Sequence, residues 1–434
     1  MRYRPCTTDE TKIGMLYYLS GVDGTGGRIK VQPEDFRVTE ISDGPPEDSE
    51  GRYTIAKVTS TNWETNRMIR LITRDLGISR ERVGFAGTKD KRAVTSQLMS
   101  FDAAPDRLDM VDLKDLEISD IYRSKRPIRI GDLIGNRFSI RVKDMDMDIS
   151  DIPETLDSIV SDVHDTGGFP NYFGVQRFGV VRPVTHLVGE QIVRGNIEGA
   201  VRLYLSEPSE FEGEDTIIAR RELAERDDWG ELIKIMPKNM GFEKSMVGHL
   251  MDNPDDWCGA IMALPNNLQM MLVHAYQSYL FNIMLSKRME EGLPLDLPVE
   301  GDTVIPLSAD GTPDHGRPVV ATSKNLDLVE SQVKSGRAFV SITLFGSDSV
   351  IQDGLIGEIE SSVIEREGLK ASDFMVPGLN RCSSKGSRRE ILCPVSDLGF
   401  NMGEDHYDVE FTLSKGNYAT TLMREFMKSP MLNY

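Results

Sequence analysis

The most informative stretch of this 434-residue sequence is GFAGTKDKRAVTSQ, residues 84–97. A short apolar strand leads into a turn in which Asp90 lies between Lys89 and the pair Lys91-Arg92. Cations within reach would keep the carboxylate ionised, as a nucleophile or base must be, and the glycines would let the backbone approach a substrate closely. A hairpin turn with exposed charges would have the same pattern, so the spacing alone leaves both interpretations open.

The segments around this turn indicate a mixture of strands and helices. Apolar and polar residues alternate in VQPEDFRVTE, residues 31–40, and in NRFSIRVK, residues 136–143, which predicts half-buried strands. Thr61-Asn62-Trp63-Glu64 has the form of a capping box, and apolar residues follow it at helical spacing as far as Leu76. We therefore expect a helix that begins after Thr61 and stops at Gly77.

The middle of the chain is largely helical, whereas its end returns to strands. Helical spacing dominates from about Ile152 to Ala371, with a long apolar run from Leu268 to Met284 that ends near Gly292. Residues 407–413 alternate as a strand, and the helical run TTLMREFMK follows. Strand-rich ends around a helical middle predict one domain interrupted by an insertion.

Composition excludes several classes of protein. Apolar residues make up 39% of the chain and charged residues 27%, and no apolar run approaches the ~18 residues of a membrane span. The N-terminal residues lack the apolar stretch of a secretory signal, so we expect a soluble, cytoplasmic protein without a membrane partner. The four cysteines have no C-x-x-C spacing and the six histidines no H-E-x-x-H, so we expect reduced, buried cysteines and no metal.

The charge distribution is uneven. A net charge of −19 argues against a simple nucleic-acid binder, because phosphate contacts need lysine and arginine. Residues 121–143, however, hold seven basic residues against one acid, and residues 381–389 hold four against none. A charge run is most often a solvated face, but two uncompensated basic stretches on an acidic chain favour contacts with phosphates.

Two further stretches interleave rings, amides and cations. GNRF, residues 135–138, begins a basic strand, and PNYFGVQRFG, residues 170–179, places three aromatic rings around Arg177. Rings beside cations suit stacked bases next to phosphates, although residues 170–179 would serve equally as a packed domain junction.

The glycine-rich GVDGTGG, residues 21–27, continues into an extended segment rather than a helix, so we interpret it as a turn and not as a nucleotide loop.

At these residues the chain resembles the TruD family of pseudouridine synthases, including its archaeal and eukaryotic branches. Lys30 with PEDFRVTE is similar to the first family motif, GFAGTKDKRAVTSQ to the second, and GNRF with PNYFGVQRFG to the next. GSRRE and FTLSKGNYATTLMREF are similar to the C-terminal motifs, although SKGNYAT lacks the proline that bacterial members usually have before the glycine. Several motifs in the same order are far more specific than any one of them.

The resemblance implies an α+β fold. The expected catalytic core is the pseudouridine-synthase core, with a mixed, mostly antiparallel sheet, formed by residues 1–168 and 390–434. A largely helical α/β insertion domain, residues 169–389, would interrupt it.

The resemblance also implies roles for individual residues. Asp90 would be the catalytic nucleophile and Lys30 its basic partner, and Asn136 and Phe138 would line a uridine pocket. The remaining expected contacts to the substrate are Lys89, Arg177, Arg388 and Arg389.

The implied activity is isomerisation of one uridine of tRNA, uridine 13, to pseudouridine without a cofactor. Two other functions remain open from the residues themselves. One is a non-catalytic RNA-binding protein, in which a carboxylate among cations would have no purpose. The other is a carboxylate-based hydrolase of a nucleoside or glycosyl bond, which would release free base. The sequence does not indicate an oligomeric state.

Overall fold

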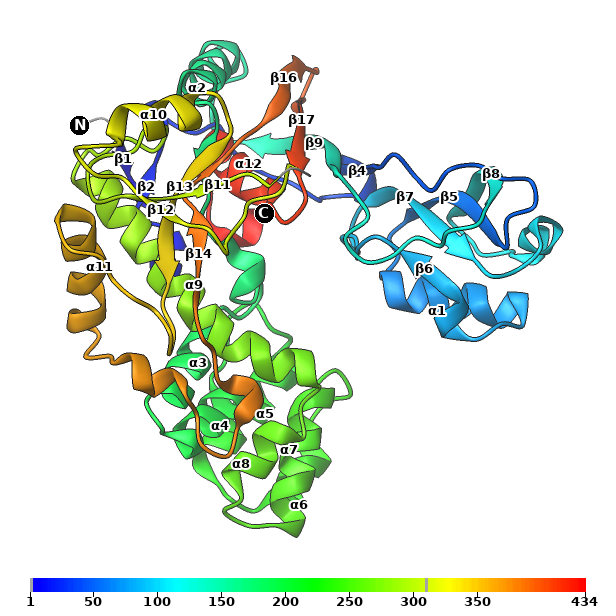
Figure 1. Ribbon diagram of the computed structural model, residues 1–434. Coiled ribbons are helices and arrows are strands. Elements are labelled where there is room, and N and C mark those ends of the chain that lie inside the picture. The colour runs from blue at the N-terminus through cyan, green and yellow to red at the C-terminus, as the bar shows by residue number, and fades with distance from the viewer. Residues whose placement is uncertain (1–2, 309–310) are drawn as a thin grey trace. The chain divides into compact units, whose positions relative to one another are not determined.

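The computed structural model describes residues 3–308 and 311–434, and the chain forms two compact units. The first, here called the sheet unit, comprises Val22–Phe169, Pro394–Ser429 and Asn433–Tyr434. The second, here called the helical unit, comprises the residues up to Gly21 together with Pro170–Cys393 and Pro430–Leu432. Figure 1 labels the elements of both.

One large sheet organises the sheet unit. Its strand order is β16-β17-β9-β4-β7-β5-β8, with β3 beside β9 and β6 beside β7. The strands are β3 (Gly26–Arg28), β4 (Phe36–Ile41), β5 (Tyr53–Thr61), β6 (Val83–Phe85), β7 (Val94–Phe101), β8 (Leu116–Ser124), β9 (Gly135–Met145), β16 (Ser396–Met402) and β17 (His406–Ser414).

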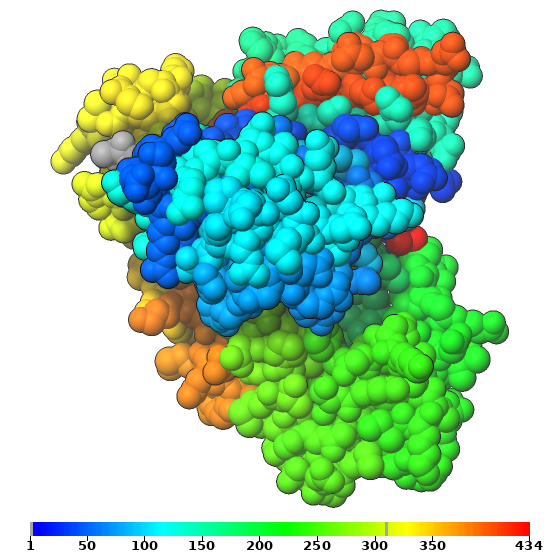
Figure 2. Space-filling view, turned by 90° about the vertical axis from the view of Figure 1, so that its right-hand side faces the viewer, coloured from blue at the N-terminus to red at the C-terminus, as the bar shows by residue number. Residues whose placement is uncertain are grey.

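The sheet is mixed and mostly antiparallel, as the sequence predicts. β4 and β7 run parallel, whereas β9 pairs antiparallel with both β4 and β17. In Figure 2 the orange to red C-terminal strands lie against blue-green segments that precede them by more than two hundred residues. Phe36 and Val38 on β4 and Phe138, Ile140 and Val142 on β9 are buried, which confirms the predicted alternation.

Helix α1 (Thr65–Leu76) covers part of this sheet with the predicted apolar face. It begins later than the capping-box pattern predicts. Thr61 is still in β5, where its N–H donates to the carbonyl of Asp115 (2.9 Å), so it is not available as a cap. The carboxylate of Glu64 caps the helix instead, accepting from the N–H groups of Asn66 and Arg67, and Gly77 ends it with a φ of 60°.

Two more helices complete the sheet unit. In α2 (Ile152–Thr166) the residues Ile152, Leu156, Ile159 and Val163 are buried, and every residue of α12 (Ala419–Met427) is buried. Helix α12 packs against β3 and α2. The closing helical run of the sequence therefore belongs to the core of this unit.

The helical unit contains most of the helices and a small sheet of order β12-β11-β13-β14. Its helices are α3 (Thr185–Val193), α4 (Ile197–Ser206), α5 (Glu214–Glu225), α6 (Trp229–Ile235), α7 (Gly241–Asp252), α8 (Trp257–Met262), α9 (Asn266–Glu290), α10 (Leu326–Lys334) and α11 (Leu355–Arg366). Its strands are β1 (Arg4–Pro5), β2 (Tyr17–Tyr18), β11 (Thr303–Pro306), β12 (Val319–Val320), β13 (Ala338–Leu344) and β14 (Ser387–Glu390). The chain passes between the units at β10 (Phe169–Pro170) and just after β15 (Leu392–Cys393).

The N-terminal segment packs with the helical unit, although we expected all of residues 1–168 to belong to the catalytic core. Its backbone is bound by polar side chains of the long helix α9: Asn282 donates to the carbonyl of Ile13 (2.9 Å) and Ser286 to that of Gly14 (2.8 Å). These bonds cross about 270 residues of sequence, so local patterns could not indicate them.

Candidate active site

Asp90 lies in the turn between β6 and β7, and three contacts hold this turn in place. The N–H of Lys89 donates to Oγ1 of Thr65 at the start of α1 (3.0 Å). The Lys89 ammonium donates to Oε2 of Glu40 on β4 (2.6 Å), and the Arg92 guanidinium donates to the carbonyl of Val31 (3.0 Å). The turn is therefore anchored on both sides of Asp90, whose side chain stays 45% exposed.

Lys30 supplies the cation that faces Asp90. Its Nζ donates to Oδ1 of Asp90 at 3.3 Å and lies 4.2 Å from the centroid of the Phe36 ring. The Lys30 backbone has a φ of 58°, which costs a non-glycine residue roughly 1–3 kcal/mol and persists only where the surroundings enforce it. One restraint is the neighbouring N–H of Ile29, which donates to the carbonyl of Asn433 (2.9 Å). The fold thus brings together two charges that are sixty residues apart in sequence.

Lys89 does not point toward solvent. Its side chain and that of Glu40 are 6% and 1% exposed, so the two form a buried ion pair. Glu40 also accepts a hydrogen bond from the N–H of Leu98 on β7 (3.4 Å). We predicted Lys89 as a substrate contact, but in the structure its ammonium pairs with Glu40 on β4 and so joins the Asp90 turn to the sheet.

Asn136 and Phe138 both lie on β9, on the face that also carries Glu40. Asn136 is directly opposite Glu40 in the β4–β9 register. Its Oδ1 is buried and accepts no hydrogen bond. Phe138 is only 5% exposed, stacked on Phe411 with the ring centroids 5.2 Å apart and edge-on to Phe36. Phe138 is therefore a wall of the apolar core beneath Lys30, whereas Asn136 keeps an acceptor available.

Gln97, the last residue of the stretch 84–97, was not among the predicted site residues. Gln97 is 2% exposed, and its Oε1 is buried without a hydrogen-bond partner. It lies two residues after Thr95, which is opposite Val38 in the parallel β4–β7 pair, so Gln97 is on the same sheet face as Glu40 and Asn136. An unpaired buried acceptor costs about 1–3 kcal/mol, which makes Gln97 a candidate for contact with a ligand. Its sequence signal was a polar residue on the apolar side of an alternating strand.

Arg388 lies in β14 of the helical unit, with its guanidinium surrounded by protein groups. It donates to Oγ of Ser341 (3.0 Å), to Oγ1 of Thr343 (2.8 Å) and to Oε1 of the buried Glu360 (3.0 Å). The basic stretch 381–389 is therefore partly a strand. Arg388 stabilises the small sheet and has few donors left for a phosphate.

Arg389 and Arg177 both lie close to one buried ring. Their guanidinium carbons are 4.2 Å and 5.2 Å from the centroid of Phe173, and Arg389 also donates to Oδ1 of Asn171 (2.6 Å). The aromatic rings of residues 170–179 are buried, so they are part of the packed interior and are not exposed surfaces for stacked bases. Arg177 differs from Arg389 because its Nε is buried without an acceptor.

Four of the seven basic residues in the stretch 121–143 are paired with acids of the sheet unit. Salt bridges join Lys125 to Asp48, Arg126 to Asp132, Arg141 to Asp408 and Lys143 to Asp35. The guanidinium of Arg123 donates to the carbonyl of Gly51 (2.7 Å from Nε). Within the described part of the chain, Arg123, Arg129 and Arg137 are the members of this stretch without a carboxylate at ion-pair distance.

The described residues contain neither a metal-binding cluster nor a membrane-spanning helix. Among residues 3–308 and 311–434 there is no group of three or more histidine, cysteine, aspartate or glutamate side chains placed to hold a metal ion. No helix of these ranges has the length and apolar character needed to cross a membrane. The four cysteines are free thiols, and Cys382 and Cys393 are buried.

Comparison with known proteins gives one consistent result. Residues 12–426 match the family model described as tRNA pseudouridine synthase D (TruD). A Methanococcoides burtonii protein named "Probable tRNA pseudouridine synthase D" is 42% identical over 96% of this chain and 97% of its own length, and a Halobacterium salinarum protein of the same name is 40% identical over 97% and 98%. A crystal structure of the Methanosarcina mazei TruD protein superposes with a TM-score of 0.87 at 40% identity, covering 98% of both chains.

Proposed function

The chain belongs to the tRNA pseudouridine synthase D (TruD) family, and on that premise we propose that it isomerises uridine 13 of tRNA to pseudouridine with Asp90 as the nucleophile. The observation that carries the proposal is the carboxylate of Asp90, held on an anchored turn 3.3 Å from the ammonium of Lys30. The position in tRNA rests on the family resemblance alone.

The reaction rearranges one nucleotide without any net gain or loss of atoms. The bond between C1′ and N1 breaks, the uracil turns, and C1′ bonds to C5; the hydrogen on C5 leaves as a proton and N1 gains one. Asp90 would act by attacking C1′ or C6 or by removing a ribose proton, and each route needs an ionised carboxylate. Lys30 stabilises that charge by Coulomb attraction, and Asp90 is exposed enough to meet a nucleotide.

The target uridine must leave the base stack, at a cost of a few kcal/mol. Asn136 and Gln97 offer unpaired buried carbonyl oxygens on the sheet face near the Asp90 turn. An acceptor suits the N3–H of uracil, whereas cytosine has no hydrogen at N3, so these amides would favour uracil. Phe138 would form the apolar wall beneath the base rather than a free stacking platform.

The geometry narrows the set of RNA contacts. Lys89 in the sheet unit and Arg388 and Arg389 in the helical unit are engaged with protein groups, so each stabilises its own unit. Arg177 remains a proposed contact because of its unpaired Nε. Arg137 is exposed on β9 but lies on the sheet face opposite to Asn136 and Phe138, so we do not place it at this site.

The test is to incubate the protein with unmodified tRNA transcripts and to map pseudouridine chemically. We expect one modified position, uridine 13, and none in a transcript with cytidine there. Modification elsewhere would overturn the assignment of the position. Intact, unmodified tRNA would favour the RNA-binding alternative, and free uracil in the chromatogram would favour a hydrolase.

A further inference from the structure

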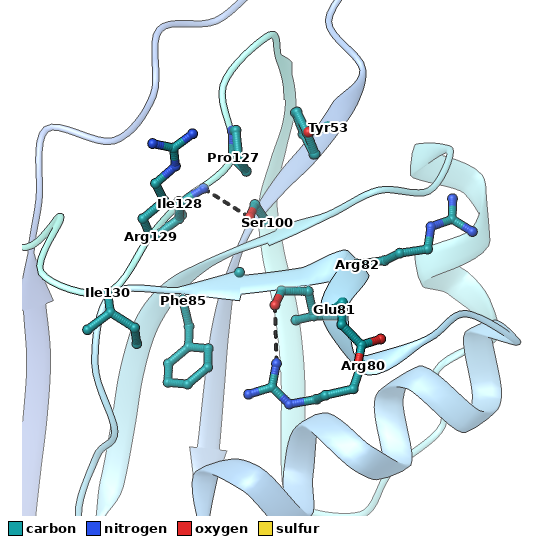
Figure 3. Close-up of a pocket in the computed structure, with 12 residues that line it drawn as sticks. Tyr53, Arg80, Glu81, Arg82, Phe85, Ser100, Pro127, Ile128, Arg129 and Ile130 are labelled. Carbon is teal, nitrogen blue, oxygen red and sulfur yellow. Dashed lines mark hydrogen bonds between the residues drawn. The ribbon is translucent and has the colours of Figure 1, made fainter.

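A cleft with a volume of about 500 Å³ lies in the sheet unit, beside strand β6. Its walls are the short helical turn Arg80–Arg82, strand β6 and the loop Pro127–Ile130, with Tyr53 and Ser100 between them (Figure 3). We propose that this cleft binds a single-stranded segment of the substrate RNA outside the catalytic turn, through its phosphates and one stacked base. The identity of the RNA as substrate rests on the proposed function.

The cleft has a surplus of positive charge on a chain that is strongly acidic. Arg82 shares the carboxylate of Asp102 with Arg52, so one acid serves two cations. Arg80 and Arg129 have no carboxylate at ion-pair distance within residues 3–308 and 311–434, and Glu81 is the acidic side chain in the lining. Such a local surplus attracts a polyanion despite the net charge of −19.

The lining also offers flat surfaces of the kind that bases stack on. The guanidinium of Arg80 lies over the Phe85 ring, 5.2 Å from its centroid, and Arg52 lies over Tyr53 at 5.4 Å. Ile130 is 72% exposed at the rim. Single-stranded RNA is recognised by stacking on rings and guanidinium planes next to cations, whereas an acidic peptide would use only the charges.

The two walls of the cleft are joined by backbone contacts, so the site is preformed. The N–H of Ile128 donates to Oγ of Ser100 (3.0 Å), and that of Gly131 donates to the carbonyl of Ala86 (2.8 Å). A Cβ atom at Gly84 would lie 2.1 Å from the carbonyl oxygen of Ile128, so only glycine allows this approach. A preformed site loses little entropy when it binds.

The cleft is connected to the catalytic turn by a short piece of chain. Phe85 precedes Asp90 by five residues, so their Cα atoms are at most about 18 Å apart. An RNA strand held in the cleft would therefore pass within a few nucleotides of Asp90. The cleft would position the strand next to the nucleotide that reacts.

The experiment measures how binding of an unmodified tRNA transcript depends on salt, in the full chain carrying Asp90→Asn so that no turnover is needed. Neutralising both uncompensated cations, Arg80→Gln with Arg129→Gln, should reduce the log–log salt slope by about 1.4, which corresponds to two phosphate contacts on a single strand. Arg80→Lys with Arg129→Lys should keep the slope, because the charges remain. Lys234→Gln with Lys334→Gln is the matched control: both lysines are exposed on helices of the other unit and paired to glutamates.

A second readout identifies the contact directly. With a transcript containing 4-thiouridine, ultraviolet light should crosslink peptides that contain residues 80–85 or 127–130, and the crosslinks should disappear in the double glutamine variant. Thermal melting establishes that this variant is folded. A folded double glutamine variant with an unchanged slope, or crosslinks only outside these peptides, would overturn the proposal. Product mapping with the wild-type chain is separate, so failure of the proposed function and failure of this site are distinguishable.

Discussion

Glu40→Gln should lower the free energy of unfolding of the sheet unit by about 3–5 kcal/mol, the usual cost of breaking a buried ion pair. The Lys89 Nζ and Glu40 Oε2 atoms are 2.6 Å apart, and the two side chains are almost completely buried. Removing one charge leaves the other in a medium of low dielectric constant without a partner. The amide oxygen of glutamine can still accept from the N–H of Leu98, so the loss comes from the charge.

Urea unfolding followed by tryptophan fluorescence measures this change in the sheet unit. The chain has three tryptophans. Trp63 belongs to the sheet unit, so Trp229 and Trp257, which lie in the helical unit, are first replaced by phenylalanine.

Two variants serve as controls for Glu40→Gln. Asp408→Asn breaks a partly exposed pair with Arg141 and should cost no more than about 1 kcal/mol. Glu40→Gln with Lys89→Met removes both charges and should recover most of the loss. If Glu40→Gln cost no more than Asp408→Asn, the reasoning about the anchored turn would be refuted.

Three further outcomes are expected. Gln97→Met removes an unpaired buried oxygen, so it should lower kcat/KM for the tRNA at least tenfold (~1.4 kcal/mol) while the urea midpoint does not fall; a lower midpoint with normal kinetics would show a structural role. Arg388→Gln should destabilise the helical unit by roughly 3 kcal/mol, because it leaves the buried carboxylate of Glu360 without its ion-pair partner. The salt slope of tRNA binding should stay unchanged, and a changed slope would show that Arg388 contacts a phosphate. Burial lowers the pKa of His186 to about 4 from the ordinary 6.5, so its neutral ring contributes stability that is complete above about pH 6.5 and is lost as the pH falls toward 4. The helical unit should therefore lose about 2 kcal/mol more between pH 7 and pH 5 than the same unit with His186→Phe, measured by urea unfolding, and equal losses would contradict this assignment.

Local periodicity was enough to predict many elements of the fold. The alternation at Phe36 and Val38, the apolar face of α1 and the long helix α9 are all present, because burial of one face imposes a period on the sequence. The predicted start of α1 was wrong by several residues. Thr61 is of a residue type that often caps a helix, but it belongs to β5 and its N–H donates to the carbonyl of Asp115.

The site was only partly predictable, because its partners come from distant segments. The resemblance pairs Lys30 with Asp90, and the structure places them within 3.3 Å. A count of charges along the chain could not show that Lys89 pairs with Glu40, or that acids outside residues 121–143 pair with three of the seven basic residues in that stretch. Counting basic residues along the chain therefore overestimated the number of cations that are free to bind RNA. The missing hydrogen-bond partner of the Gln97 side-chain oxygen could be recognised only from the structure around it.

The central claim is that the carboxylate at residue 90 performs the reaction, and Asp90→Asn tests it most directly because the amide keeps the shape and removes the charge. Wild type, Asp90→Asn and the exposed control Asp106→Asn are incubated with the same unmodified tRNA, and pseudouridine formation and tRNA affinity are measured together. We expect Asp90→Asn to form no product while it binds tRNA as the wild type does, and Asp106→Asn to be fully active. Normal turnover by Asp90→Asn would contradict the account.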